Sequence, residues 1–360
     1  MFIIFIIEYN NIYLNKMNPM KFSPLLLFPL ALLLTACPSD KPADQPTTIS
    51  NHSTTNALMI PVFSADSAYA LTAKQVAFGP RVPNRSAHVN CGNYLAATLR
   101  SYGLKVLEQP FEAKTFDGHT IQGRNIIAQF QPEMVRRVAI FAHWDTRPFA
   151  DHDTLHKNAP MDGASDGASA VATALEIVRV LSRQPIDARP AMGVDVFLLD
   201  AEDSGYEQET QSELKNQVDE SNGRSSWCLG SQYWAAHLLP ANYRAEYGVL
   251  LDMVGAKNGH FTREYNSRQN ALGVVDKIWN TATKIGYSDF FLYKDTDAII
   301  DDHVYTTQAG VPTVDIYDHP PYGMEPFPAY HHTTADNMDV IDRKTLKAVG
   351  QTMLNLLYSE

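Results

Sequence analysis

The amino-acid sequence predicts an α/β protein of the three-layer αβα class, in which a central mixed, mostly parallel sheet lies between two layers of helices. Short apolar segments alternate along the chain with longer segments whose apolar residues recur at helical spacing. Parallel strands are joined by helical crossovers and are buried on both faces, so this alternation favours a single large domain. Internal repeats are absent from the sequence, which also favours one domain.

The first half of the domain begins with two helices and a pair of strands. Apolar residues at helical spacing predict the helices, and each of these segments ends at a glycine, Gly79 and Gly103. Ser86 is the expected N-cap of the second helix. The expected elements are helices at 65–79 and 86–102 and strands at 105–111, 125–130 and 138–142.

The second half alternates strand and helix more regularly. The expected elements are helices at 167–181, 230–238, 269–285 and 342–358 and strands at 194–199, 247–251 and 310–316. Residues 205–226 are rich in charged, Gln, Asn and Ser residues and have little to bury, so we expect a surface insertion there.

The composition of the chain argues against nucleic acid as a binding partner. The chain has 360 residues, 45% of them hydrophobic and 19% charged, which is ordinary for a globular protein. The formal net charge is −11, and no basic run interleaved with aromatic residues is present. Nucleic acid is therefore not an expected partner, because phosphate binding needs clustered Lys and Arg. The sequence leaves the oligomeric state open.

The N-terminal residues have the pattern of a targeting segment. From Met20 the chain reads MKFSPLLLFPLALLLTAC, a basic start followed by a short apolar run and small residues before Cys37. Residues 34–37, LTAC, resemble the lipobox of bacterial lipoproteins, whose cysteine carries the lipid. We therefore expect a signal segment at 1–37, a flexible tether at 38–65, and a catalytic domain at 66–360 in an exported lipoprotein, anchored to a membrane in the periplasm or at the cell surface. A plain secretory signal with an accidental cysteine is the alternative.

Two cysteines, Cys91 and Cys228, remain in the exported part. An oxidising compartment permits a disulfide between them, and two buried free thiols are the equal alternative. The sequence has no CxxC pair or zinc-finger spacing.

Acids and histidines follow several of the expected strands. Glu202 and Asp203 come after the strand in LLDAEDSG (198–205). His143, Asp145 and Asp252 each follow another apolar strand directly. Because the carboxyl ends of parallel strands meet at one edge of a sheet, these side chains are expected to gather there.

Further candidates come from the turns. Asp166 stands where a long loop enters a helix, close to a helix N-terminus that favours an ionised carboxylate. The runs Asp301-Asp302-His303 and His331-His332-Thr333 follow later in the chain. Carboxylates and imidazoles without cysteine suit a catalytic zinc that is held by three protein ligands. EF-hand, GxGxxG, GxxxxGK[ST], GxSxG and HExxH patterns are all absent, so these residues alone predict a zinc-dependent hydrolase or transferase.

Nine short motifs add a family resemblance across residues 75–358. They are FGPRVP (78–83), AHWDTRP (142–148), GASDGASA (163–170), LLDAEDSG (198–205), GSQYWA (230–235), LLDMVGAKN (250–258), DDHVY (301–305), AGVPTVDI (309–316) and HHTTADN (331–337). In this order they resemble the zinc-dependent glutaminyl cyclases of animal type and their bacterial relatives, which share a fold with the zinc aminopeptidases.

The resemblance implies an enzyme that converts the N-terminal glutamine of peptides and proteins to pyroglutamate and releases ammonia. One zinc ion would polarise the side-chain amide of the glutamine. The residues that match the family's site would be Asp166, Asp203 and His332 as zinc ligands, Glu202 as general acid/base, and Asp252 and Asp301 as the carboxylates beside it.

The main alternative is a di-zinc aminopeptidase, which removes N-terminal residues from peptides. Its second zinc would use His143 and Asp252, with Asp166 as the bridge, and all of these residues are present. The acid at Asp301 favours the cyclase, because aminopeptidases usually carry a small residue there. A membrane-anchored binding or scaffold protein without activity is the third hypothesis.

The sequence departs from the family pattern at two positions. Animal cyclases have glutamate where this chain has Asp203, and either carboxylate can ligate zinc. The tryptophan that usually precedes the ligand histidine is His331 here, which leaves a choice between two adjacent histidines; the following Thr333 favours His332. Phe327 and His331 are the expected walls of a substrate pocket, although Phe327 is equally explained as a loop-packing aromatic.

Overall fold

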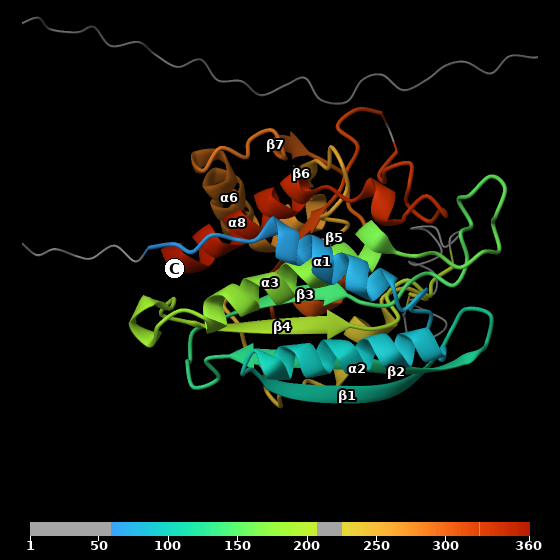
Figure 1. The fold of residues 1–360 in the computed structure, drawn as a ribbon, viewed down its shortest axis with the longest axis horizontal. Helices are drawn as coiled ribbons and strands as arrows, with labels where there is room; N and C mark the ends of the chain where they lie inside the picture. Colours follow the sequence, from blue (N-terminus) through green and yellow to red (C-terminus); the bar gives the residue numbers. More distant parts are fainter. Residues whose placement is uncertain (1–58, 207–224, 324) are drawn as a thin grey trace, which may run out of the picture. The chain divides into compact units, whose positions relative to one another are not determined.

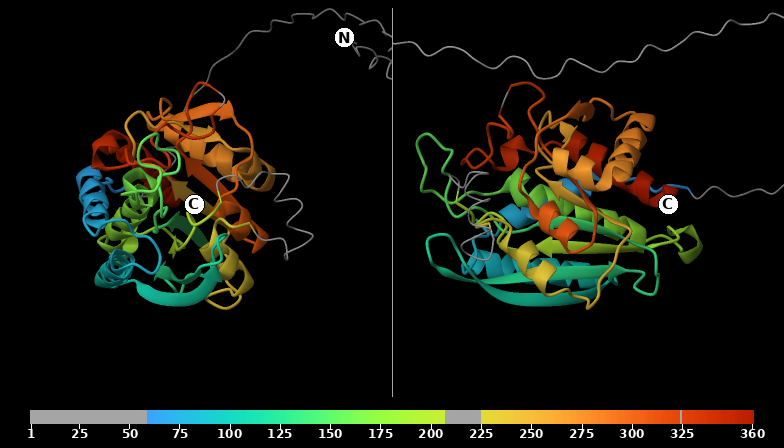
Figure 2. Two further views of the ribbon diagram at one scale, coloured as in Figure 1. Left: turned by 90° about the vertical axis from the view of Figure 1, so that its right-hand side faces the viewer. Right: turned by 180° about the vertical axis from the view of Figure 1, so that it is seen from behind.

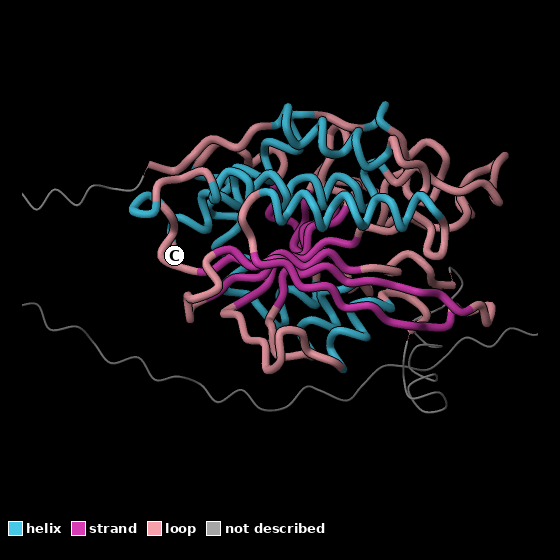
Figure 3. The backbone as a smooth tube through the Cα atoms, turned by 60° about the horizontal axis from the view of Figure 1, so that its bottom comes forward, coloured by secondary structure: helices cyan, strands magenta, loops and turns pink. Residues whose placement is uncertain are grey.

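The central sheet sets the position of every other element. The computed structural model describes residues 59–206, 225–323 and 325–360. The sheet has six strands in the order β1-β2-β4-β3-β5-β8 and lies between two layers of helices (Figures 1 and 3). Neighbours β4-β3, β3-β5 and β5-β8 are parallel, whereas β1-β2 and β2-β4 are antiparallel. The predicted three-layer αβα class with a mixed, mostly parallel sheet is confirmed.

The strands of the main sheet are β1 (Lys105–Lys114), β2 (Thr120–Phe130), β3 (Arg137–His143), β4 (Gly193–Leu199), β5 (Tyr247–Asp252) and β8 (Thr313–Tyr317). Each was expected from the sequence, but β1 ends three residues later than expected, β2 begins five residues earlier and β8 begins three residues later. A second sheet, which the sequence analysis missed, pairs β6 (Phe261–Arg263) with β7 (Phe291–Asp295). These strands have three and five residues, which are too few to show a clear period in the sequence.

Helices cover both faces of the sheet (Figure 2). The described α-helices are α1 (Ala65–Val76), α2 (Ser86–Ser101), α3 (Ala170–Ser182), α5 (Leu229–Ala236), α6 (Tyr265–Lys284), α7 (Asp302–Gln308) and α8 (Arg343–Ser359). Short helical turns occur at Ala164–Ser169, Ile186–Ala188 and Met338–Val340.

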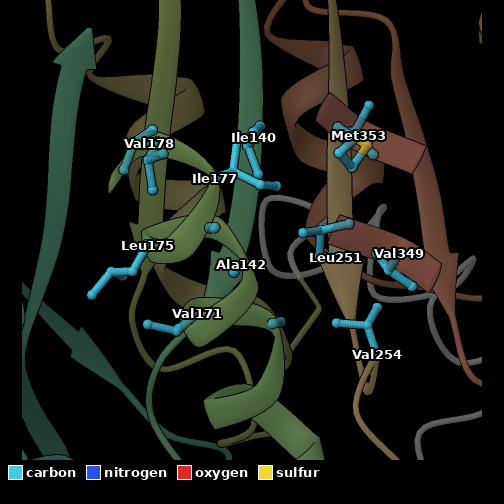
Figure 4. Close-up of a cluster of buried hydrophobic side chains, with 14 of the residues drawn as sticks. Ile140, Ala142, Val171, Leu175, Ile177, Val178, Leu251, Val254, Val349 and Met353 are labelled. Atoms are coloured by element: carbon cyan, nitrogen blue, oxygen red, sulfur yellow. The ribbon is translucent and has the colours of Figure 1, made fainter. Parts of the chain in front are cut away.

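Alternating side chains of the buried strands pack into two separate apolar layers. In β3, Ile140 and Ala142 face the cluster that includes α3 and α8 (Figure 4), whereas Phe141 packs in the other layer against Trp234 of α5. Leu175 of α3 is fully buried in the first layer. Burial of a Leu, Ile or Phe side chain contributes about 1.5–3 kcal/mol to the stability of the fold. Packing on both faces therefore holds the strands in place.

Several helix limits differ from the sequence expectation, and one helix was not expected; α1 ends three residues earlier than expected and α3 begins three residues later. Ser86 is the first residue of α2 instead of its N-cap; Arg85 takes the cap position and makes no side-chain cap bond. Helix α6 begins before residue 269, because the Glu264 carboxylate accepts the backbone N–H groups of Asn266 and Ser267 and caps it. Helix α7 was not predicted, since its seven residues are too few to show a period.

The expected tether is described only at its C-terminal end. Phe63 is 1% exposed, and its backbone N–H donates to the Gln351 side chain of α8 at 2.9 Å. The packed domain therefore includes residues just before 66. The signal segment at 1–37 with Cys37, and residues 207–224 of the expected insertion, lie outside the described residues.

The described residues contain neither a membrane-spanning helix nor a disulfide. No described helix is both long enough and apolar enough to cross a bilayer. Cys91 and Cys228 are both free and fully buried, so the thiol alternative is the one that the structure shows.

A buried ion pair in the middle of the sheet gives a stability prediction. The Asp195 carboxylate of β4 accepts two bonds from Arg137 at 2.5 and 2.6 Å and one from the Tyr243 hydroxyl at 2.8 Å, and it is fully buried. We expect Asp195→Ala to lower the free energy of unfolding by about 3 kcal/mol, because it leaves a buried guanidinium without its counter-charge. Denaturant titration measures this. Asp276→Ala, which removes an exposed partner of Arg263, is the control and is expected to cost less than about 1 kcal/mol.

Candidate active site

The candidate site lies at the carboxyl edge of the parallel strands. His143 is the last residue of β3 and Asp252 the last of β5. Glu202 and Asp203 follow the carboxyl end of β4, the end at which the β4 arrow points in Figure 1. Strand ends that share an edge thus bring together side chains far apart in sequence.

The turn after β4 is held by a carboxylate from the segment that follows β3. Asp145 accepts the backbone N–H of Glu202 at 3.1 Å through one oxygen and that of Asp203 at 3.3 Å through the other. Ala201 just before them has φ 56°, a left-handed conformation that is uncommon for alanine. The sequence analysis placed Asp145 at this edge but gave it no role; it positions the two acids.

The three predicted zinc ligands converge. His332 Nε2 lies 3.1 Å from an Asp203 oxygen and 3.9 Å from an Asp166 oxygen. One ligand atom from each of these residues lies within 4.8 Å of the others. All three are at least 97% buried, so water competes little for their lone pairs.

Asp166 owes its place to an irregular turn that its sequence does not reveal. The turn Ala164–Ser169 contains non-helical backbone at Asp166 and at Gly167, whose φ is 91°. The Asp336 carboxylate accepts the backbone N–H groups of Ser165 at 2.7 Å and Asp166 at 3.1 Å. Asp336 lies in the HHTTADN motif, but sequence reasoning assigned it no function; it fixes the turn that presents Asp166.

Asp203 is oriented by a fully buried arginine. The backbone N–H of Arg147 donates to Asp203 Oδ2 at 2.9 Å, which leaves Oδ1 facing His332. The Arg147 guanidinium donates to the carbonyl oxygens of Asp203 and Gly205 at 3.2 and 3.1 Å. Arg147 belongs to the AHWDTRP motif, but no sequence pattern indicates this contact, which joins segments more than fifty residues apart.

The charges of this cluster fit a divalent cation. Burial and the neighbouring Asp203 carboxylate raise the pKa of Asp166 to about 6. Although burial acts in the opposite direction, the His332 imidazole and Arg147 hold the pKa of Asp203 below its usual range. Two adjacent buried carboxylates with an imidazole form a donor set that zinc accepts, and a bound cation would offset their repulsion.

The alternative second set of ligands converges as well. His143 Nε2 lies 2.9 Å from an Asp166 oxygen and 3.2 Å from an Asp252 oxygen. Since Asp166 belongs to both clusters, it stands between the two candidate metal positions. Geometry alone therefore retains the residues that a two-metal site would need.

Glu202 belongs to a third group of side chains, which contains another carboxyl group. Ligand atoms of Glu202, Cys228 and Asp301 lie within 4.8 Å of one another, and Asp301 is the N-cap of α7. Burial is the larger cause, and the nearby Asp301 carboxylate the second, of a pKa of Glu202 well above its usual range. Burial and the Asp252 carboxylate do the same for the pKa of Asp301. Acids with raised pKa values in a buried cluster are typical of functional sites.

The two expected pocket residues lie together beside a predicted zinc ligand. The rings of Phe327 and His331 stack with centroids 4.2 Å apart, and His331 stacks on His332 at 3.6 Å. Phe327 also contacts Tyr317 of β8 at a centroid distance of 5.9 Å. The pocket role of Phe327 and His331 stays a prediction.

Buried carboxylates and imidazoles at the carboxyl edge of a mostly parallel sheet define the metal-dependent hydrolase and transferase class of α/β proteins. Within that class, the chain belongs to peptidase family M28, whose family model matches residues 125–357.

Some known proteins that resemble the chain are named glutaminyl cyclases, and others are named peptidases. The glutaminyl-peptide cyclotransferase of Bos taurus is 25% identical over 271 residues, which cover 67% of this chain and 68% of the relative. The crystal structure of Bacteroides thetaiotaomicron glutaminyl cyclase bound to N-acetylhistamine is 44% identical, covers 84% of this chain and all of its own, and has a TM-score of 0.77. A leucine aminopeptidase precursor from the same species is 43% identical with a TM-score of 0.76, over 84% of this chain and 99% of its own. The predicted resemblance to glutaminyl cyclases within a zinc exopeptidase fold is confirmed.

Proposed function

We propose that the protein is a zinc-dependent glutaminyl-peptide cyclotransferase, which converts N-terminal glutamine of peptides and proteins to pyroglutamate. The observation that carries the proposal is the pair of Glu202 and Asp301, two acids with ligand atoms within 4.8 Å of each other that are not members of the Asp166, Asp203 and His332 group. The likeness to the bovine cyclotransferase and the Bacteroides cyclase supports the same activity.

Asp166, Asp203 and His332 would hold the zinc ion. When bound there, zinc supplies Lewis-acid polarisation of the carbonyl of the glutamine side chain. The short, packed contacts of Asp203 with Arg147 and of Asp166 with Asp336 fix the ligands before substrate arrives, which reduces the reorganisation needed during the reaction.

Glu202 moves the proton. Its carboxylate accepts a proton from the substrate α-amine as the amine nitrogen forms a bond with the side-chain carbonyl carbon. The same carboxyl group then donates that proton to the amide nitrogen as the carbon–nitrogen bond breaks and ammonia leaves. No water is consumed, so the reaction needs no activated hydroxide. A raised pKa suits a group that must both accept and donate near neutral pH.

Asp252 and Asp301 would support the general acid/base. Burial and the Asp252 carboxylate raise the pKa of Asp301, which favours the protonated form of its carboxyl group. A shared proton between these two carboxyl groups would draw Asp252 away from metal binding. On this basis we propose one zinc ion per chain.

A di-zinc aminopeptidase is the second candidate, favoured by one specific observation. His143, Asp166 and Asp252 form a ready second cluster, and one structural relative is named as an aminopeptidase precursor. That reaction would use a hydroxide to cleave the peptide bond.

One assay separates the candidates. We expect the zinc-loaded protein to release ammonia from a peptide that begins with glutamine, and to contain about one zinc per chain by metal analysis. Free amino acids from unblocked peptides, with two zinc ions per chain, would establish the aminopeptidase. Peptide binding without either product would instead indicate a scaffold protein. Chelation followed by zinc replacement checks that the ion is required.

We also propose that residues 1–37 direct export and that Cys37 carries a lipid anchor. The support is the LTAC sequence at 34–37 and the apolar run before it. Fatty-acid labelling of the wild type, and its loss in Cys37→Ala, would be the expected result; labelling of neither chain would leave only a secretory signal.

A further inference from the structure

Cys228 contacts the proposed general acid/base directly. Its Sγ lies 3.2 Å from Glu202 Oε1 and donates the thiol hydrogen to it. The thiol is fully buried, and burial together with the Glu202 carboxylate raises its pKa well above the usual range. A thiol in this state is a weak hydrogen-bond donor and a poor nucleophile or metal ligand.

The backbone around Cys228 is clamped to the backbone around Glu202. The N–H of Cys228 donates to the Glu202 carbonyl at 2.9 Å, and the N–H of Leu229 donates to the Ala201 carbonyl at 3.1 Å. Ala201 and Cys228 both have left-handed backbone, with φ 56° and 58°. Such conformations are retained where surrounding contacts compensate for their strain, and they occur often at functional sites.

The close packing extends to the next residue. A Cβ at Gly230 would lie 2.2 Å from the Asp200 carbonyl oxygen, so only glycine fits there. The start of α5 is thus pressed against the turn after β4, and this contact fixes the backbone of Cys228 beside the backbone of Glu202.

We propose that Cys228 is a positioning residue that engages Glu202 Oε1 and leaves Oε2 to exchange the proton with substrate. The inference rests on the proposed role of Glu202. The same orientation would serve a general base in the aminopeptidase reaction, so the proposal holds for whichever reaction the wild type catalyses.

The test uses Cys228→Ala, Cys228→Ser and the control Cys91→Ala in the full chain. Cys91 is also a fully buried free thiol, but it lies on α2 in the apolar core. We expect Cys228→Ala to lower kcat about tenfold with KM changed less than about twofold, because the carboxylate loses its fixed orientation. Cys228→Ser keeps a donor and is expected to stay within about threefold of the wild-type kcat. Cys91→Ala should lower the melting temperature and leave kcat unchanged.

Zinc content and a crystal structure give readouts that do not depend on turnover. Each Cys228 variant should keep the wild-type zinc content, and the Glu202 carboxylate in Cys228→Ala should occupy more than one rotamer. An unchanged kcat in Cys228→Ala, or equal losses in Cys228→Ala and Cys228→Ser, would overturn the proposal. So would a single, unmoved Glu202 rotamer. A wild type that releases amino acids instead of ammonia refutes the cyclase assignment alone, and the same variants are then compared in that assay.

Discussion

Replacing Glu202 with glutamine is expected to lower kcat by about 100- to 10,000-fold, the usual contribution of general acid/base catalysis. The amide occupies the same space as the carboxylate but cannot accept the proton of the substrate amine. Zinc content should not change, since Glu202 lies in a cluster with Cys228 and Asp301, apart from the proposed zinc ligands. Ammonia release and metal analysis on the same preparation measure both effects.

Glu246→Gln is the matched control for this substitution. Glu246 undergoes the same chemical change, but it is an exposed residue whose carboxylate pairs with Arg136. We expect wild-type turnover and zinc content from it. Loss of zinc in Glu202→Gln would mean that the roles of Glu202 and Asp203 are reversed, and full activity would remove Glu202 from the mechanism.

The sheet and the position of the site followed from the sequence because both depend on simple periodic signals. Apolar segments that end in acids or histidines identified β3, β4 and β5, and the shared edge of parallel strands then brought their ends together. Short elements such as α7 carry too few residues for a period to be visible, although the acids that begin it were noticed.

The residues that orient the site could not be predicted in the same way. Asp336 and Arg147 act on backbone groups of segments distant in sequence, and no local pattern marks such contacts. The contact of Cys228 with Glu202 likewise depends on how α5 meets the turn after β4. Residue types and motifs predict which side chains would do the chemistry, whereas the orientation of those side chains depends on tertiary packing.

The structure distinguishes the two adjacent histidines, which the sequence motif alone does not. His332 has φ 55°, and its Nε2 points to Asp203. His331 instead places its ring between Phe327 and His332. A left-handed residue at 332 turns the two neighbouring side chains to different surroundings, an effect that no sequence pattern expresses.

The different surroundings of His331 and His332 predict different effects when each is replaced by alanine. His332→Ala should lose zinc on dialysis, with an affinity drop greater than the roughly 10- to 100-fold that loss of an outer partner costs, because one of three proposed ligands is removed. His331→Ala should keep its zinc and raise KM, since it removes a ring from the expected substrate pocket and leaves the ligand cluster intact. Metal analysis after dialysis, with ammonia release across substrate concentrations, measures both.

The pair is decisive because each variant is the control for the other. The two residues share the same chemistry, the same loop and nearly the same exposure, at 8% and 3%, so a general loosening of the loop would release zinc from both. Zinc loss confined to His331→Ala would instead transfer the ligand role to His331. Retention of zinc in His332→Ala would point to the second cluster of His143, Asp166 and Asp252 as the main metal position, and would thereby favour the aminopeptidase arrangement over the single-zinc cyclase.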